Sequence, residues 1–164
     1  MSAPMIVFVC WGNICRSPMA AIVASAYAQR EGVKVTFDSA GLSAEEHGNP
    51  IDPRAAAVLR RAGYAIEPHN ARRITVDEVK AASMLIGMEQ FHLERLRALV
   101  PGLNDLYLLS DFDPDARPGE ETPDPWYGPD SGFDETLKKI EAAMPEIIRR
   151  ARELAASAPD SAPR

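Results

Sequence analysis

Met5-Ile-Val-Phe-Val-Cys10-Trp-Gly-Asn-Ile-Cys-Arg-Ser-Pro18 is the most informative stretch of this chain. Its first, apolar and β-branched part predicts a short strand that is buried on both faces of a parallel sheet. At its other end, Ser17 and Pro18 predict a helix start, with Ser17 as N-cap and Pro18 at the first helical position. A strand that leads through a short loop into a helix is typical of α/β proteins, which bind ligands where such strands end.

Strand and helix patterns alternate along the rest of the chain. Further strands are expected at residues 33–38, 83–88 and 105–109, and helices at 18–31, 52–61, 75–81, 89–99 and 132–156. This order predicts an α/β fold, a single-domain three-layer sandwich with a four-stranded parallel sheet and helices on both faces. We expect the domain to span residues 1–157, followed by a frayed tail at 158–164.

Cap and turn residues mark the expected ends of the helices. Asp52, which precedes a proline, and Thr75, which opens a capping box, are predicted N-caps. Gly32 is predicted to end the first helix. Residues 110–131 are rich in proline and acidic side chains, and we expect a long functional loop there. Pro145 is expected either to kink the last helix or to break it.

Composition excludes several classes of partner. Eighteen basic and 24 acidic residues give a formal net charge of -6, which argues against nucleic acid because that partner requires a basic face. No apolar run approaches the roughly 20 residues that cross a membrane. The N-terminus lacks a signal-peptide pattern, so we expect a cytoplasmic location, and export by a signal-less route stays open. The histidines show no ligand spacing, and neither a metal nor another cofactor is expected.

The loop after the first strand has the residues of a phosphate site. A helix N-terminus offers free N–H groups and partial positive charge, which suit a phosphate dianion. The same field favours the thiolate of Cys10, which is the nucleophilic form. Arg16 can hold two phosphate oxygens with its planar fork, and Gly12 is expected to adopt the backbone angles that turn successive amides inward. These features together predict a small cysteine-dependent phosphatase.

Residues 9–18 resemble the signature of the low-molecular-weight protein tyrosine phosphatases. The segments Asp38-Ser-Ala-Gly41, His69-Asn-Ala-Arg72 and Asp124-Pro-Trp-Tyr-Gly128 resemble other family segments in the expected order. The likeness extends over nearly the whole chain. It implies an enzyme that hydrolyses phosphotyrosine in proteins through a phosphocysteine intermediate and releases inorganic phosphate.

The resemblance also implies a role for individual residues. Cys10 would attack phosphorus, Arg16 would clamp the phosphoryl oxygens, and Asp124 would serve as acid and then base. The phosphate-binding residues would be Trp11, Gly12, Asn13, Ile14, Cys15, Arg16 and Ser17. The residues that brace this loop would be Asn13, Ser17, Ser39 and His69. For Ser17, capping the helix and donating a hydrogen bond to the Cys10 thiolate are competing uses.

The expected substrate cleft departs from the family pattern. Glu45 stands where family members often have an aromatic wall, Trp11 where Thr or Leu is more common, and Trp126 where tyrosine is usual. One interpretation is that Trp11, Trp126 and Tyr127 sandwich a phosphotyrosine ring in place of the missing wall. The other is that Trp11 packs on the protein surface while Glu45 is a solvated loop charge.

Other functions remain as alternatives. Family members that act on phosphoarginine have a threonine at the position of Ile14, so the isoleucine favours phosphotyrosine over a protein-arginine phosphatase. Arsenate reductases of this fold need more cysteines than Cys10 and Cys15, and a phosphate-binding module would not need both Cys10 and Asp124. In the family, the cysteine matching Cys15 can form a reversible disulfide with the nucleophile; a small buried packing residue is the alternative.

Overall fold

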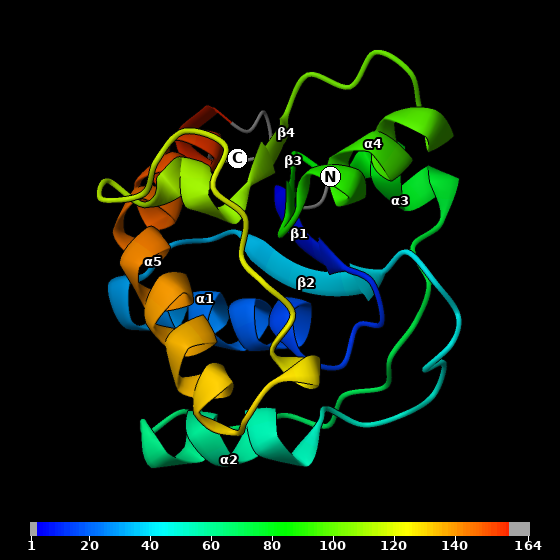
Figure 1. Cartoon of the computed structure of the whole chain (residues 1–164). Coiled ribbons are helices and arrows are strands. Elements are labelled where there is room, and N and C mark those ends of the chain that lie inside the picture. The colour runs from blue at the N-terminus through cyan, green and yellow to red at the C-terminus, as the bar shows by residue number, and fades with distance from the viewer. Residues whose placement is uncertain (1–2, 158–164) are drawn as a thin grey trace.

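Within residues 3–157, which the computed structural model describes, parallel strands form a four-stranded sheet in the order β2-β1-β3-β4 (Figure 1). The strands are β1 (Met5–Cys10), β2 (Thr36–Gly41), β3 (Met84–Gly87) and β4 (Leu106–Leu108). The helices are α1 (Arg16–Glu31), α2 (Pro53–Arg61), α3 (Val76–Ala81), α4 (Gln90–Leu99) and α5 (Ser131–Ser157). The 3₁₀ turns are η1 (Leu109–Phe112) and η2 (Pro125–Tyr127).

The sheet is the middle layer of the predicted three-layer sandwich, which is confirmed. Helices α1, α2 and α5 lie on one side of the sheet, and α3 and α4 lie on the other (Figure 1). Alternate residues of β1 serve the two sides, as expected for a strand with both faces covered. Ile6 and Phe8 belong to the core beneath α1 and α5, whereas Val7 and Val9 belong to the core beneath α3 and α4.

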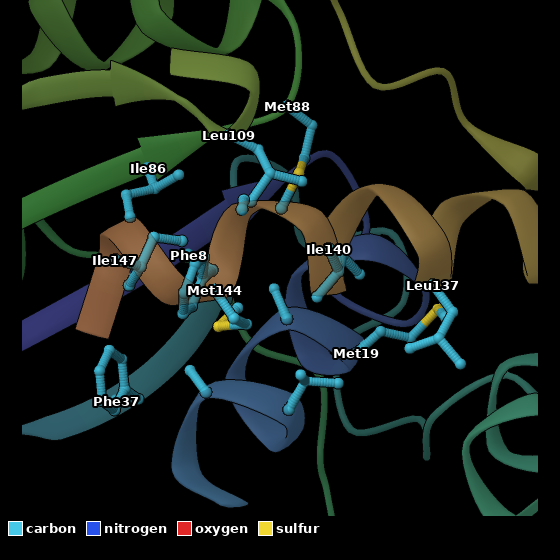
Figure 2. Packing of buried hydrophobic residues seen from close by; sticks show 14 of the residues in the cluster. Phe8, Met19, Phe37, Ile86, Met88, Leu109, Leu137, Ile140, Met144 and Ile147 are labelled. Carbon is cyan, nitrogen blue, oxygen red and sulfur yellow. The ribbon is translucent and has the colours of Figure 1, made fainter. Parts of the chain in front are cut away.

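Helix α5 closes the larger core with one continuous apolar face. Its residues Leu137, Ile140, Met144 and Ile147 recur every three or four positions and point toward the sheet and α1 (Figure 2). Each such buried side chain stabilises the fold by roughly 1.5–3 kcal/mol. Pro145 lies on the exposed side of this helix, which continues to Ser157. Of the two predicted alternatives the break is therefore wrong, and the kink stays a prediction.

Most local predictions hold, and two need correction. Asp52 and Thr75 cap α2 and α3, and Gly32 ends α1 in the left-handed conformation with φ of 70°. The second strand spans Thr36–Gly41 instead of 33–38, because its parallel pairing with β1 extends as far as Gly41. The region expected to be a long loop contains η2 and most of η1, whose short turns have no helical periodicity in sequence.

The order of the strands determines where a ligand site can form. The chain passes from β1 outward to β2 and from β3 outward to β4, so it leaves the neighbouring strands β1 and β3 in opposite directions. In open parallel sheets, ligands bind at this switch point, beyond the carboxyl ends of the strands. Residues 10–17, hereafter the phosphate loop, follow β1, and Glu89 follows β3.

The predicted frayed tail, residues 158–164, lies outside the described residues. Between residues 3 and 157, no helix combines the length and the hydropathy that crossing a membrane requires.

Candidate active site

The phosphate loop presents Cys10 at the end of β1, directly before the N-terminus of α1. The Cys10 side chain is buried, with 3% of the residue exposed, and its Sγ lies 3.0 Å from Ser17 Oγ. Ser17 is not the N-cap that the sequence predicted: α1 begins at Arg16, with Cys15 in the cap position and no side-chain cap bond. Ser17 Oγ accepts a hydrogen bond from Asn13 Nδ2 at 2.9 Å, so its O–H is free to donate to the cysteine sulfur.

Asn13 holds the phosphate loop from inside. Its Nδ2 donates to Ser17 Oγ and, at 3.0 Å, to Ser39 Oγ, while its Oδ1 accepts from the backbone N–H of Arg72 at 3.0 Å. Its carbonyl oxygen lies 2.7 Å from His69 Nε2. The structure thus brings together all four residues that the sequence analysis proposed as braces, and it adds the backbone of Arg72.

The unusual backbone angle of the loop falls on Asn13, with φ of 62°, and not on Gly12 as predicted. Asparagine tolerates this left-handed region better than most residues because its short polar side chain can bond locally. Gly12 is required for close packing and not for its backbone angles. A Cβ at Gly12 would lie 3.3 Å from Cγ of Glu46, so the glycine allows this loop to pass close to the next one.

Arg16 is held by a network that the sequence did not reveal. Its side chain is 2% exposed, and its Nη1 donates to Glu89 Oε2 at 2.5 Å and to the Thr122 carbonyl at 2.8 Å. Among the described residues, neither Nε nor Nη2 makes a hydrogen bond, which leaves one edge of the guanidinium for two phosphate oxygens. Glu89 has a signal that could have found it, because it lies two residues after β3, the buried strand beside β1.

His92 fixes Glu89 in turn. Its Nδ1 accepts hydrogen bonds from the backbone N–H groups of Met88 and Glu89, at 3.1 and 3.0 Å, at the start of α4. Burial, with a smaller contribution from the charge of Arg16, lowers the pKa of His92 to about 3. The ring is therefore neutral at physiological pH, and Nε2 has no hydrogen-bond partner in the part of the chain that the structure describes.

Asp124 reaches the same site from the segment that precedes α5. Its Oδ1 accepts from the backbone N–H of Trp126 at 3.0 Å and caps η2, and its Oδ2 lies 3.6 Å from Arg16 Nη2. Cys10, Arg16 and Asp124 line one cleft of about 150 Å³. The predicted cleft residues also line it: Trp11, Glu45, Trp126 and Tyr127. Within residues 3–157, no group of His, Cys, Asp or Glu side chains could hold a metal ion.

Comparison with known proteins agrees with this geometry. A family model described as low molecular weight phosphotyrosine protein phosphatase matches residues 5–157. The chain belongs to this family. Its members are cysteine-dependent hydrolases, and the chain is an enzyme of that class.

Relatives and solved structures match over nearly their whole length. The low molecular weight protein-tyrosine-phosphatase of Streptomyces coelicolor is 38% identical over 152 residues, which cover 89% of this chain and 92% of that protein. The low molecular weight protein-tyrosine phosphatase A of Mycobacterium tuberculosis is 37% identical, over 90% of this chain and 91% of its own. A crystal structure of protein tyrosine phosphatase from Entamoeba histolytica, with Hepes in its active site, superposes with a TM-score of 0.86 at 28% identity, covering 92% and 98% of the two chains.

In this phosphatase, two of the three departures in the substrate cleft contact each other. Trp11 Nε1 donates a hydrogen bond to Glu45 Oε2 at 2.5 Å, so the carboxylate holds the indole that follows the nucleophile. Glu45 is exposed but paired, and Trp11 is half-buried in the wall of the cleft. Trp126 and Tyr127 are exposed by 44% and 86%, and they line the same cleft.

The second thiol of the phosphatase differs from the first in its surroundings. Cys15 is buried, and burial raises its pKa well above the usual range, helped by the nearby carboxylates of Asp52 and Asp124. Cys15 is therefore protonated at neutral pH and does not compete with Cys10 as a nucleophile. Both thiols are free, and the regulatory disulfide stays a prediction.

Asp52 and Arg54 join the phosphate loop to the segment that carries the acid. The backbone N–H of Asp52 donates to the Ile14 carbonyl at 2.9 Å, and its carboxylate binds Arg54 Nε and Nη2 at 3.1 and 3.0 Å. Burial opposes ionisation of Asp52, but the hydrogen bonds and charge of Arg54 outweigh it and hold the pKa of Asp52 below its usual range. The Arg54 guanidinium lies over the ring of Trp126, 5.1 Å from its centroid, and over Phe133 at 4.6 Å.

Proposed function

We propose that this phosphatase hydrolyses phosphotyrosine in proteins by two transfers through Cys10. In the first, the Cys10 thiolate forms an S–P bond while the P–O bond to the tyrosine breaks, and Asp124 gives its proton to the leaving phenol oxygen. In the second, Asp124 takes a proton from water, which attacks phosphorus and releases inorganic phosphate and the thiolate. The convergence of Cys10, Arg16 and Asp124 on one cleft supports this proposal.

Arg16 and the loop amides would stabilise the charge that spreads over the equatorial oxygens during both transfers. The geometry supports this role, because Glu89 and Thr122 occupy only Nη1 and leave the other edge of the guanidinium available. Ser17, 3.0 Å from the sulfur, would stabilise the thiolate as nucleophile in the first transfer and as leaving group in the second.

The preference for phosphotyrosine over phosphoarginine rests on the walls of the cleft. Trp11, Trp126 and Tyr127 offer aromatic surface at its mouth, which suits a phenyl ring. Ile14 adds an apolar residue to the lining, at the position where phosphoarginine enzymes of the family have threonine. The partners would be phosphotyrosine-containing proteins, in the reducing cytoplasm that a free thiolate requires.

A substrate panel with two variants tests the proposal. The wild type should hydrolyse phosphotyrosine peptides with a higher kcat/KM than matched phosphoarginine or phosphoserine peptides. Cys10→Ser should be inert. With p-nitrophenyl phosphate, whose leaving group needs little protonation, Asp124→Ala should accumulate phosphate on Cys10, measurable by mass spectrometry.

The alternatives have distinct outcomes. A phosphoarginine optimum would replace phosphotyrosine as the substrate class while leaving the roles of Cys10 and Arg16 intact. Arsenate-dependent oxidation of thioredoxin would establish an arsenate reductase instead. If Cys10→Ser kept the activity of the wild type, the covalent mechanism would be wrong.

A further inference from the structure

A second groove opens from the catalytic cleft toward α4. It is an open groove of about 530 Å³, and Arg16 and Asp124 line both spaces, so the two adjoin. We call it the α4 groove, defined by Trp11, Phe91, Arg95, Pro123 and Tyr127. A peptide whose phosphotyrosine enters the cleft would therefore lay a neighbouring side chain in this groove.

Trp11 forms the aromatic floor where the groove and the cleft meet. Its ring lies 6.0 Å from that of Phe91, at an angle of 49°, and Phe91 is 38% exposed. The Arg95 guanidinium lies over the Trp11 ring, 5.5 Å from its centroid. Glu45 accepts a hydrogen bond from the indole N–H, so Trp11 is held by Glu45 and contacted by both Phe91 and Arg95.

Arg95 is the unpaired cation of the groove. It is exposed, and within residues 3–157 it forms no ion pair, whereas the neighbouring charges of Arg16 and Glu89 are paired with each other at 2.5 Å. A guanidinium that stacks on an aromatic face keeps its edge N–H groups available for a carboxylate. Arg95 lines the groove and not the cleft, whereas Glu45 and Glu46 line the cleft and not the groove. The groove's own carboxylates are Glu89, which is paired with Arg16, and Asp124, which it shares with the cleft.

We propose that the α4 groove binds an acidic side chain next to the phosphotyrosine of the substrate, through Arg95 and the Trp11–Phe91 surface. This inference rests on the proposed function and names the class of phosphoprotein that the site prefers. Because Arg95 is at the rim, its contribution is to capture of substrate, and we expect it in kcat/KM. Attraction of this kind amounts to about three- to tenfold between acidic and basic peptides.

The test compares phosphotyrosine peptides that differ only in having Glu or Lys beside the phosphotyrosine, on either side. The wild type should prefer one Glu peptide over its Lys counterpart by about three- to tenfold in kcat/KM. Arg95→Gln should bring this ratio close to one, and Arg95→Glu should reverse it. Arg97→Glu, which makes the same charge change at an exposed position of α4 outside the groove, should leave the ratio as in the wild type.

The ratio is insensitive to a general loss of activity, since both peptides meet the same enzyme preparation. An unchanged ratio in Arg95→Glu, or an equal change in Arg97→Glu, would overturn the proposal. If the wild type hydrolysed all the peptides at equal rates, the proposed role of the α4 groove would be wrong, but the proposed phosphatase activity would stand. No turnover of any phosphotyrosine peptide would instead refute the proposed function, and the groove with it.

Discussion

The two loops that form the active site are held in different ways. In the phosphate loop, every residue from Asn13 to Ser17 is buried, and the Asn13 side chain alone bonds Ser17, Ser39 and the backbone of Arg72. The acid loop, residues 123–128, exposes Trp126 and Tyr127, and within residues 3–157 the one hydrogen bond of the Asp124 side chain is to its own turn.

This difference matches what each loop has to do. The phosphate loop must offer fixed dipoles to a developing charge, and their value depends on not having to reorganise during the reaction. The acid loop must meet the leaving group of an incoming protein substrate, so it lies at the surface with few bonds. We therefore expect substitutions in the phosphate loop to lower stability, and substitutions in the acid loop to lower turnover alone.

The largest expected effect is on turnover, and it comes from a substitution in the acid loop. Asp124→Asn keeps the size of the side chain but cannot donate the proton, so kcat for a phosphotyrosine peptide should fall about 10²- to 10⁴-fold. The urea midpoint should change little, because within residues 3–157 the Asp124 side chain accepts one hydrogen bond, from its own turn, and its contact with Arg16, at 3.6 Å, is longer than a hydrogen bond. The loss should be smaller for p-nitrophenyl phosphate; an equal loss on both substrates would mean that Asp124 is not the acid.

The next largest expected effect is on stability, and it comes from Asn13→Ala in the phosphate loop. It removes three side-chain hydrogen bonds and places alanine at φ of 62°. The free energy of unfolding should fall by about 2–4 kcal/mol, measured by urea denaturation. Asn13→Gly serves as the matched control, since it loses the same bonds without the backbone strain and should be about 1 kcal/mol more stable than alanine. Wild-type stability in both variants would contradict the comparison.

The pH dependence of stability should show that His92, which lies near Arg16, is buried in its neutral form. The folded pKa of about 3 lies below the ordinary value of 6.5, so the unfolded chain binds a proton that the folded chain does not. Stability should therefore fall as pH falls below 6.5, by up to about 1.4 kcal/mol per pH unit from this residue. His92→Asn, which can still accept from the backbone N–H groups, should remove that slope between pH 6.5 and 4.5.

An exposed histidine is the control for this measurement. His47→Asn should leave the slope unchanged, because His47 lies at the surface. Because the pKa of Asp52 is lowered in the folded chain, this carboxylate stabilises the fold at any pH above its unfolded pKa. That stabilisation is lost only near pH 4 and below, so a measurement between pH 6.5 and 4.5 separates the effect of His92 from that of Asp52. An identical slope in His92→Asn and the wild type would show that His92 is not buried in its neutral form.

The smallest expected effect on turnover comes from Arg54, which connects the phosphate loop to the acid loop. Arg54→Ala removes the stacking on Trp126 while Asp52 keeps its backbone bond to the phosphate loop, and we expect kcat to fall about fivefold with little change in KM. The urea midpoint should also fall, because the buried Asp52 carboxylate loses the guanidinium that offsets its burial. Arg61→Ala, on the same helix and in an exposed ion pair with Asp134, is the control and should keep the kcat of the wild type. A loss of stability without a loss of kcat would show that Arg54 serves the fold and not the acid.

Local features of the fold were predictable because neighbouring residues determine them. The strand at Met5–Cys10 follows from its run of buried apolar side chains, and the caps at Asp52 and Thr75 follow from side chains that bond N–H groups two or three residues away. Ser17 was the exception. Its sequence context is that of a helix cap, yet Cys10 and Asn13 engage its hydroxyl in the folded loop.

The sequence by itself determined the phosphate loop, the strand before it and the helix after it, together with the candidates Cys10, Arg16 and Asp124. The resemblance also supplied the four residues that brace the loop, whereas the tertiary structure alone decided how Arg16 and Trp11 are held. Sheet pairing places β3 beside β1, which brings Glu89 within 2.5 Å of Arg16, and loop packing joins Trp11 to Glu45. The physical reason is distance along the chain: a cap or a strand depends on near neighbours, whereas these contacts form only when the sheet and its loops assemble.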